Sequence, residues 1–249
     1  MRKQCVFGPI LSRRLGWSLG INLVPYKTCN LDCVYCECGT TSNLVNERKE
    51  YLPTDGVIET LKEAARRLRG NPPSCVTFAG WGEPTLHLHF GEIARAAKKL
   101  FPEERVVLIT NGTLFAQDEE LLSEVQGVDL IIPSLDAGGE ETFECLNRPH
   151  PSLSFQEHLR GLLLLRKNFS RAIWLEIFIV EGINDTEKEL EALKEHITRL
   201  SPDKVHINTV DRRPACEWVR APSPEKLREI ARFLGGEIIP PLHRERVTL

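Results

Sequence analysis

The stretch Cys29-Asn30-Leu31-Asp32-Cys33-Val34-Tyr35-Cys36 places three thiols within eight residues, in the spacing C-x₃-C-x₂-C, with an aromatic residue just before the third. Three thiolates at this spacing can wrap a loop around one face of a cubane iron–sulfur cluster. Such clusters usually take four cysteine ligands, so a loop of three leaves one iron without a protein ligand. A small molecule can bind and react at an open iron. The stretch, called the cysteine loop below (residues 29–36), therefore predicts a catalytic metal site on Cys29, Cys33 and Cys36.

The same loop allows one other metal. Cys38 extends the spacing to C-x₃-C-x₂-C-x-C, which offers four sulfur ligands to a structural zinc ion. Structural zinc is usually held by two separated pairs of ligands, whereas four ligands within ten residues would be cramped. The chain has no second C-x-x-C pair, so the spacing favours the cluster over zinc.

The composition bounds the rest of the molecule. With 249 residues, 41% of them hydrophobic, the chain can bury a large core and suits a single domain over residues 1–249. A net charge of −3 and a pI near 6.2 give no global basic surface for nucleic acid. The cysteines bunch in one loop, unlike those of small secreted disulfide proteins. Because no signal segment or membrane-length apolar run occurs, we expect a protein of the reducing cytoplasm with no membrane anchor.

Strand and helix patterns alternate along the chain. After an irregular N-terminal segment (1–18), apolar runs predict strands over 19–24, 75–79, 105–110, 128–134, 173–180 and 204–209. Helical spacing predicts helices over 54–68, 90–100, 118–126, 152–168 and 190–200, and a last helix over 224–234 within the C-terminal segment 215–249. Thr54 and Ser223 are the expected caps of the first and last helices.

Six strands alternating with helices imply parallel pairing and right-handed crossovers. The strands are apolar throughout, as strands buried on both faces should be. An eight-unit barrel needs about 250 residues with compact loops, and long loops use part of the length here. We therefore predict an α/β fold, a partial (β/α)₆ TIM-like barrel of parallel strands.

Chemistry in such barrels collects at the carboxyl ends of the strands, which places the cysteine loop and the other strand ends on one rim. Gly82 and Glu83 follow the second strand, where glycine lets the backbone approach a ligand and a carboxylate can accept hydrogen bonds from an ammonium group. Asn111 follows the third strand, and Ser134 and Asp136 follow the fourth, where they could meet ribose hydroxyls. Simple turns and local backbone caps are the alternative interpretations.

Polar residues also interrupt or follow the last two strands. Glu176 lies inside an apolar run. Because an ionised side chain inside a barrel is costly unless it is paired, Glu176 faces either the cavity or the outer surface. Gly182 and Ile183 form a turn near an adenine-sized slot. Asn208 shares a strand face with His206, and we favour Asn208 as a ligand contact because a buried histidine is more often a satisfied core residue.

Other residues are candidates on weaker grounds. The arginine groups Arg13-Arg14, Arg148 and Arg212-Arg213 suit carboxylate or phosphate, although solvated surface arginines are the simpler interpretation. Lys27 could form a Schiff base with a carbonyl substrate, but nothing indicates a lowered pKa, so we predict a surface lysine. The isolated cysteines are mostly expected to be small buried residues, namely Cys5, Cys75, Cys145 and Cys216.

These features together resemble a known family. The loop Cys29-x₃-Cys33-x-Tyr35-Cys36, the Gly82-Glu83-Pro84 turn and the six-unit partial barrel are similar to the radical S-adenosylmethionine superfamily. The runs FGPILSRRLGWSLGINLVPYKTCNLDCVYCECG, GWGEPTL, PSLDA, NRPHPSL and INTVDRRPA look like a branch related to the 4-demethylwyosine synthase-like enzymes, which build wyosine bases in tRNA. The likeness runs from about Phe7 to Pro214.

The resemblance implies a [4Fe–4S] cluster on the three cysteines, with S-adenosylmethionine (SAM) chelating the open iron. One electron from the cluster would cleave SAM to methionine and a 5′-deoxyadenosyl radical, which abstracts hydrogen from a substrate. A small reductant protein of the flavodoxin or ferredoxin type would supply the electron. By the same likeness, Glu83 contacts the methionyl ammonium and Gly182-Ile183 lies near the adenine. The full set of expected cofactor-binding residues is Tyr35, Gly82, Glu83, Asn111, Ser134, Asp136, Glu176, Gly182, Ile183 and Asn208.

Two departures from the wyosine enzymes matter. Archaeal wyosine enzymes carry a second cluster on N-terminal cysteines, whereas only Cys5 precedes the loop here. The chain is also shorter and acidic, which weighs against tRNA. The substrate is therefore unidentified, with a nucleoside or tRNA base as the expectation. The alternative functions are a glycyl-radical-enzyme activase acting on a protein partner and a non-catalytic, zinc-stabilised binding module.

Overall fold

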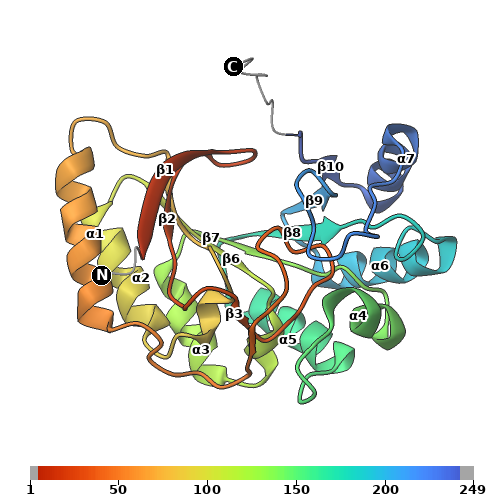
Figure 1. Ribbon diagram of the computed structural model, residues 1–249, viewed down its shortest axis with the longest axis horizontal. Helices are drawn as coiled ribbons and strands as arrows, with labels where there is room; N and C mark the ends of the chain where they lie inside the picture. The colour runs from red at the N-terminus through yellow and green to blue at the C-terminus, as the bar shows by residue number, and fades with distance from the viewer. Residues whose placement is uncertain (1–4, 242–249) are drawn as a thin grey trace.

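One open, eight-stranded sheet organises the computed structural model, which describes residues 5–241 (Figure 1). Its strand order is β1-β2-β5-β6-β7-β8-β9-β10. The strands are β1 (Val6–Ser12), β2 (Gly16–Ile21), β5 (Cys75–Phe78), β6 (Arg105–Thr110), β7 (Leu130–Pro133), β8 (Ala172–Phe178), β9 (Lys204–Asn208) and β10 (Glu237–Ile238). The six strands from β2 to β9 pair in parallel, each with its neighbour. The predicted partial barrel of six parallel strands is confirmed, and β1 and β10 are its two edges.

The prediction of an irregular segment over residues 1–18 is wrong for the part that the structure describes. β1 and β2 form an antiparallel hairpin, and its register shifts around Gly8 and Pro9. These two residues made the segment look irregular, but an edge strand tolerates proline and a bulge. The hairpin turn carries Arg14 to the barrel. Residues 1–4 lie outside the described residues.

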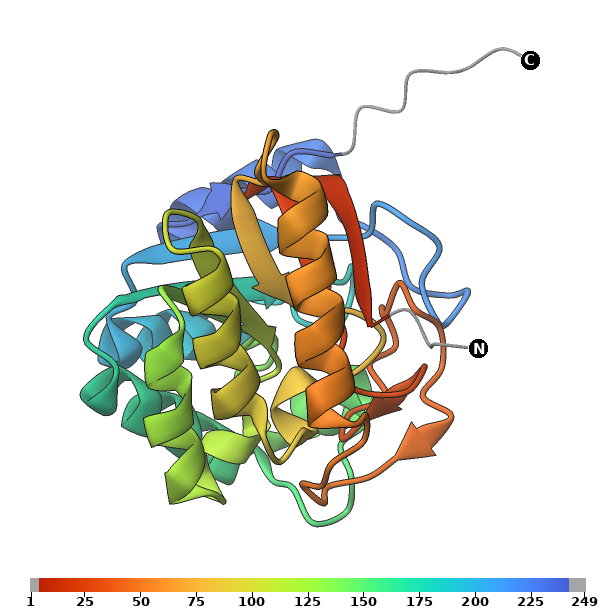
Figure 2. The same cartoon turned by 90° about the vertical axis from the view of Figure 1, so that its left-hand side faces the viewer.

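Seven α-helices occur in the described part of the chain, and α1, α2 and α3 stand side by side over the outer face of the sheet (Figure 2). Their bounds are α1 (Thr54–Leu68), α2 (Phe90–Leu100), α3 (Glu119–Glu124), α4 (Glu140–Asn147), α5 (Phe155–Asn168), α6 (Glu187–Leu200) and α7 (Pro224–Leu234). The short elements are β3 (Thr28–Cys29), β4 (Asn43–Leu44), η1 (Pro84–Leu86), η2 (Thr113–Ala116) and η3 (Val125–Gly127). No helix of residues 5–241 has both the length and the apolar character needed to cross a bilayer. Helix α4 and strand β10 were not predicted, because eight and two residues are too few for a period to stand out.

The two predicted helix caps have different outcomes. Ser223 is the cap of α7, and its hydroxyl accepts a hydrogen bond from the Lys226 N–H at 3.2 Å. Thr54 is instead the first residue of α1 and makes no cap. Its N–H and hydroxyl both donate to Oε1 of Glu50, each at 2.8 Å. The preceding turn therefore supplies the acceptor that the sequence pattern assigned to Thr54.

Alternation along the strands divides the core into two sides. On β8, the buried residues Ile173, Leu175 and Ile177 belong to the main core under the helices. Trp174 belongs to a second cluster, which lies on the other face of the sheet with residues of β5, β6 and β7. Because side chains on a strand point alternately to opposite faces, Glu176 shares the inner face with Trp174. The inside of the barrel is therefore partly apolar and partly polar.

Candidate active site

The residues expected at the strand ends lie together along the carboxyl edge of the sheet. Glu83 follows β5 and Asn111 follows β6, and the Asn111 N–H donates to Oε2 of Glu83 at 2.8 Å. Ser134 follows β7, where it is half-buried and bridges to Glu176 of β8. The cysteine loop is tied to this edge, because Nδ2 of Asn111 donates to Oδ1 of Asn30 at 2.7 Å. The predicted convergence of the loop with the strand ends is therefore present.

Each of the three thiols in the loop faces one side-chain N–H donor. Nδ2 of Asn111 lies 3.8 Å from Sγ of Cys29. Nδ2 of Asn147 lies 3.5 Å from Sγ of Cys33, and Nζ of Lys27 lies 3.2 Å from Sγ of Cys36. Donors aimed at sulfur favour the thiolate form, which is the form that binds metals.

The electrostatics of the loop show that the free thiols cannot all ionise together. Burial, followed by the nearby Glu83 carboxylate, raises the pKa of Cys29 to about 12. Burial, followed by the charge of Cys29, also raises the pKa of Cys33. A hydrogen bond from Cys38 is the largest effect that lowers the pKa of Cys36, and the charge of the Lys27 ammonium lowers it further. Three thiolates therefore require a positively charged group to hold them, and metal binding releases their protons.

Within residues 5–241, no three His, Cys, Asp or Glu side chains converge closely enough to hold a single metal ion. Zinc ligands lie about 2.3 Å from the metal and so converge on one point. Iron–sulfur clusters are held by separate thiolates on separate irons, which three thiols on one loop can supply.

Glu83 is a buried carboxylate with its oxygens already engaged. Oε1 accepts hydrogen bonds from the Thr85 N–H at 3.0 Å, the Thr85 hydroxyl at 2.5 Å and the Thr110 hydroxyl at 2.7 Å. Oε2 accepts one bond, from Asn111. Burial raises the pKa of Glu83, and the hydrogen bonds from Thr85 are the largest opposing effect. Glu83 therefore joins the ends of β5 and β6, and only Oε2 has capacity left for a ligand.

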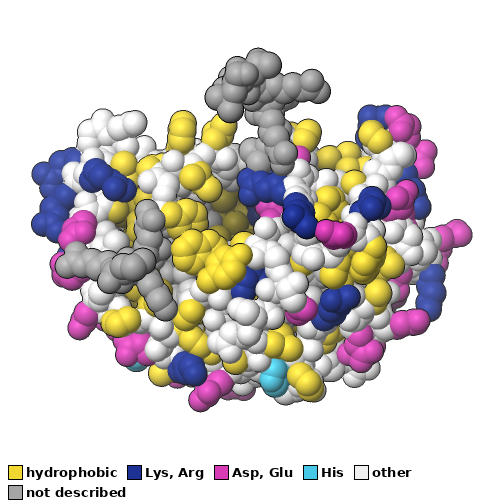
Figure 3. Space-filling model, in the orientation of Figure 1, with side chains coloured by type: hydrophobic (Ala, Val, Ile, Leu, Met, Phe, Trp, Pro, Cys, Tyr) yellow, Lys and Arg dark blue, Asp and Glu magenta, His cyan; other side chains and the backbone are white. Residues whose placement is uncertain are grey.

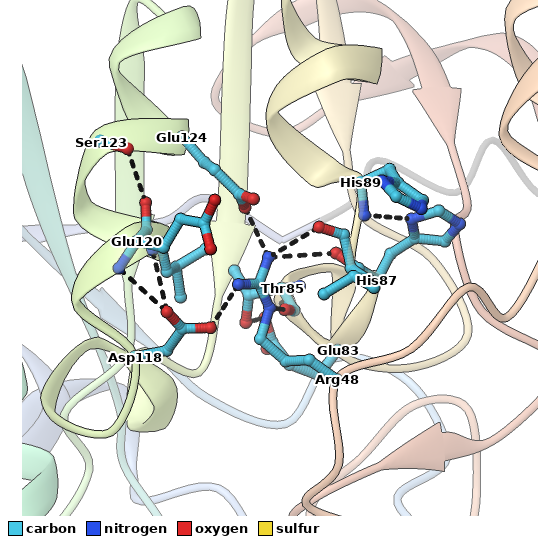
Figure 4. Close-up of polar contacts among 11 residues, drawn as sticks. Arg48, Glu83, Thr85, His87, His89, Asp118, Glu120, Ser123 and Glu124 are labelled. Carbon is cyan, nitrogen blue, oxygen red and sulfur yellow. Dashed lines mark hydrogen bonds and ion pairs between the residues drawn. The ribbon is translucent and has the colours of Figure 1, made fainter.

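Arg48 holds the segment that contains Glu83 against helix α3 (Figure 4). Its guanidinium contacts the carboxylates of Asp118 and Glu124. Nε also donates to the Thr85 carbonyl at 2.9 Å, and Nη2 donates to the His87 carbonyl at 3.3 Å. Only 8% of the Arg48 side chain is exposed. Sequence analysis did not find this residue, because its partners lie 37 to 76 residues away.

Gly82 is needed because two backbone segments nearly touch. A Cβ on Gly82 would lie 1.8 Å from the carbonyl oxygen of Thr28, just before Cys29. The Glu83 N–H donates to that same carbonyl at 3.2 Å. The glycine therefore lets the turn after β5 lie directly against the start of the cysteine loop.

Replacing Gly82 with alanine is expected to destabilise the protein by at least about 2 kcal/mol, as overpacking at a rigid contact does. The obstructing atom belongs to the backbone, so the turn and the cysteine loop must move apart. Thermal unfolding of the metal-free protein measures the change. Gly70→Ala is the matched control, because a Cβ there meets no atom within 4 Å. Equal melting temperatures for the two variants would contradict the close approach.

Asp136 and Tyr35 fasten the other end of the cysteine loop. The Tyr35 hydroxyl donates to Oδ2 of Asp136, which also accepts from Nδ2 of Asn147 at 3.0 Å. Oδ1 of Asp136 accepts from the Phe178 N–H at 2.8 Å. The Tyr35 ring stacks on Phe178 with centroids 4.0 Å apart. Asp136 is thus a buried support for the loop, and burial raises its pKa.

Asn147 is a site residue that sequence reasoning missed. It ends α4 and is buried, with Cys33, Tyr35 and Asp136 all within reach of its amide nitrogen. Its Oδ1 is buried without a hydrogen-bond partner in the described part of the chain. The run NRPHPSL begins with this asparagine, but its contact with Cys33 joins residues 114 positions apart.

A cavity of about 360 Å³ opens beside the cysteine loop, inside the barrel mouth. The space-filling view shows hydrophobic side chains around a hollow in the middle of this face, with charged side chains nearby (Figure 3). The lining comes from the hairpin, the cysteine loop and the inner face of the strands, and it includes Arg14, Tyr35, Cys36, Cys38, Glu176 and Asn208. Glu176 therefore faces the cavity and not the outer surface. Nδ2 of Asn208 lies 3.5 Å from Oε1 of Glu176.

The structure corrects the expectation of solvated arginines for the hairpin. Arg14 is largely buried and forms an ion pair with Glu176. Burial, followed by the neighbouring Arg13, lowers the pKa of Arg14 to about 10. Arg212 also lines the cavity and pairs with Glu37 at 2.8 Å. Arg213 is exposed, as predicted for a surface residue.

Lys27 is not the surface lysine that was predicted, because only 3% of it is exposed. Burial lowers the pKa of Lys27, whereas the charge of Cys36 is the largest of the effects that raise it. The net result is a raised pKa. The pKa of Lys27 therefore shifts away from that of a Schiff-base lysine. The sequence pattern carries no sign of this burial, because the enclosing atoms come from loops that fold back on it.

The remaining predicted residues have mixed outcomes. Gly182 adopts φ +75° in a turn, and its N–H donates to Oδ1 of Asp185 at 2.8 Å. Ile183 packs on the small cluster that includes Tyr35, and its contact with an adenine stays a prediction. None of the eight cysteines forms a disulfide, and Cys145 is exposed, contrary to the expectation of a buried residue. His206 is buried against Trp174, with ring centroids 5.2 Å apart.

Comparisons with known proteins bear on the family and the fold of this chain. A protein named GTPase Obg from Brachyspira hyodysenteriae is 35% identical over 233 residues, which cover 94% of this chain and 34% of that protein. The UPF0026 protein MJ1312 from Methanocaldococcus jannaschii is 31% identical over 224 residues, which cover 90% of this chain and 69% of that protein. A crystal structure of a radical SAM methyltransferase from Sphaerobacter thermophilus matches the fold with a TM-score of 0.68 at 19% identity, covering 89% of this chain and 65% of that one. The chain thus spans only about a third of the first of these relatives.

The family model described as the Radical SAM superfamily matches residues 23–197. That range contains the cysteine loop, the Gly82-Glu83 turn and strands β5 to β8. The superfamily part of the resemblance is thereby confirmed, and the wyosine branch stays a prediction. The chain belongs to the radical SAM superfamily, whose members are iron–sulfur enzymes that bind a [4Fe–4S] cluster and SAM.

Proposed function

We propose that Cys29, Cys33 and Cys36 hold a [4Fe–4S] cluster, and that the protein uses it to cleave SAM reductively. The grouping of these three thiols at the rim, each facing its own N–H donor, is the observation that carries the proposal. When bound, the cluster supplies one electron that breaks a sulfonium C–S bond of SAM, giving methionine and a 5′-deoxyadenosyl radical. The radical takes a hydrogen atom from the substrate and leaves as 5′-deoxyadenosine.

The chain's own residues position the reactants. Asn111 stands between Cys29 and the strand ends, where it can reach both the loop and the methionyl part of SAM. The remaining acceptor capacity of Glu83 Oε2 suits the methionyl ammonium. Ser134 is half-buried at the end of β7 and suits a ribose hydroxyl. Gly182 and Ile183 suit the adenine, and Ile183 packs on the small cluster that includes Tyr35.

Other predicted cofactor-binding residues are better supported as positioning residues. Tyr35 and Asp136 bind each other, so they orient the loop. Gly82 permits the close approach of the turn. Glu176 and Asn208 line the cavity and suit contact with the substrate. These assignments separate the residues that shape the loop from those that meet a ligand.

The substrate is proposed to be small. A cavity of about 360 Å³ lies at the lower end of the range for ligand sites, which is about 300–1,000 Å³. Three arginines line the wall, and each has a carboxylate partner: Arg14 pairs with Glu176, Arg212 with Glu37 and Arg13 with Asp211. The lining and its partners are therefore close to electrically neutral. A nucleoside or a single base fits this chemistry. Neither the wyosine branch nor a glycyl-radical activase role has an observation of its own in the described residues, and both stay predictions.

The proposed cellular compartment rests on the free cysteines and on the need for an electron donor. Eight free thiols suit a reducing compartment, so we place the protein in the cytoplasm. Reductive cleavage consumes one electron in each turnover. A small flavodoxin- or ferredoxin-type protein would supply it.

The proposal is tested by anaerobic reconstitution with iron and sulfide. The wild-type protein is expected to turn brown and to hold about four iron atoms per chain. After reduction with dithionite and addition of SAM, 5′-deoxyadenosine and methionine are expected to appear in equal amounts, measured by liquid chromatography. A colourless zinc-containing protein, or an iron-loaded protein that leaves SAM intact, would refute the proposal.

A further inference from the structure

Lys27 presents a buried positive charge to the cysteine loop. Its Nζ lies 3.2 Å from Sγ of Cys36, and the residue is almost fully buried. The backbone is clamped on both sides, because the Lys27 N–H donates to the Trp81 carbonyl at 2.8 Å and its carbonyl accepts from the Asn43 N–H at 3.1 Å. Lys27 also adopts φ +53°, a conformation that non-glycine residues rarely take. The fold therefore holds this ammonium against Cys36 at a cost in backbone energy.

No carboxylate neutralises this ammonium within the described part of the chain, because no ion pair to Lys27 occurs there. The charged groups near the loop pair among themselves: Glu37 lies near Arg13 and Arg212. An unpaired buried charge is costly, and the cost is offset only by a partner of opposite charge. The sulfur of Cys36, in its metal-bound and therefore anionic form, is the partner that the geometry provides.

The other two thiols face neutral donors. Asn111 reaches Cys29 at 3.8 Å and Asn147 reaches Cys33 at 3.5 Å, both through side-chain amides. Lys27 has the shortest of the three contacts and the only formal charge among them. The three corners of the loop are therefore electrostatically unequal, with the positive charge at Cys36.

We propose that Lys27 is a positioning residue that sets the reduction potential of the cluster through the charge it holds against Cys36. The proposal rests on the proposed function, because it requires a cluster on the three cysteines. Reduction adds one negative charge to the cluster, so a fixed positive charge stabilises the reduced form more than the oxidised form. The Lys27 ammonium thereby makes the cluster easier to reduce, which is the step that precedes SAM cleavage.

The test is a redox titration of the reconstituted cluster, monitored by electron paramagnetic resonance in the absence of SAM. Three substitutions separate charge from shape: Lys27→Met removes the charge and the donor, Lys27→Gln keeps a donor without charge, and Lys27→Arg keeps the charge. We expect Lys27→Met and Lys27→Gln to lower the ratio of reduced to oxidised cluster at least tenfold at a fixed potential. For one electron, tenfold corresponds to a shift of 59 mV to more negative potential. Lys27→Arg is expected to stay within threefold of wild type.

Iron and sulfide content is measured for every variant, so that a change in potential is read only from loaded protein. Equal potentials in wild type, Lys27→Met and Lys27→Gln at equal iron content would overturn the proposal. If Lys27→Met fails to load, the comparison of Lys27→Gln with Lys27→Arg decides. Loss of iron from all three variants would also overturn it, because Lys27 would then act in assembly. A wild-type protein that holds no cluster would refute the proposed function itself, so the two failures are distinguishable.

Discussion

Replacing Cys33 with alanine is expected to remove the cluster and to lower 5′-deoxyadenosine formation by more than about 100-fold, since loss of even an outer-shell partner costs 10- to 100-fold at metal sites. Cys33 is the central thiol of the loop and lies beside the Asn147 amide. Two remaining thiolates leave two irons without protein ligands, and Cys38 cannot restore the spacing. The measurements are iron and sulfide per chain, and 5′-deoxyadenosine by liquid chromatography. The same result is expected for Cys29→Ala and Cys36→Ala.

The matched control for this loss is Cys145→Ala, which removes an exposed thiol from α4. It is expected to keep full iron content and full SAM cleavage. Cys38→Ala distinguishes three sulfur ligands from four, and its measurement is iron content alone. Cys38 Sγ lies 3.6 Å from the Gly80 carbonyl, where it acts as a donor to backbone. Loss of all metal on removal of Cys38 would show a fourth permanent ligand and would leave SAM no iron to bind.

Replacing Arg48 with methionine is expected to lower the free energy of unfolding by about 3 kcal/mol, the usual cost of removing one partner from a buried ion pair. The change leaves the Asp118 and Glu124 carboxylates without their cation and the Thr85 carbonyl without a donor. Figure 4 shows that these groups surround the guanidinium from both sides. Urea denaturation of the metal-free protein measures the loss as a lower midpoint at an unchanged slope.

Arg160→Met is the control for this variant. Arg160 pairs with Glu157 three residues away and donates to the Ala116 carbonyl at 2.8 Å, and about half of its side chain is exposed. Exposed pairs of this kind contribute little to stability. A loss in Arg48→Met no larger than that in Arg160→Met would show that the Arg48 network does not hold the Glu83 turn in place.

Local patterns in the sequence predicted much of the barrel. The run RVVLIT is a strand over the residues predicted for it, Arg105–Thr110, because an apolar stretch of that length between turn signals has few other stable conformations. The N-terminal hairpin was missed, since a glycine and a proline in the middle of a strand look irregular until the neighbouring strand is known. A period of two fixes which residues share a face of a strand but not which face is inside. The sequence alone therefore does not give the inward direction of Glu176.

The sequence by itself determined the proposed ligand set of this site. The three cysteines lie within eight residues, so they share one loop wherever the fold places it. Only the tertiary structure decided what surrounds those sulfurs. The donor to Cys36 comes from 9 residues away, the donor to Cys29 from 82, and the donor to Cys33 from 114. Contacts that distant arise from packing of the whole sheet and its helices, and no local spacing records them. Ligand identity is thus a property of the chain, whereas the charge and hydrogen bonds that tune the ligands are properties of the fold.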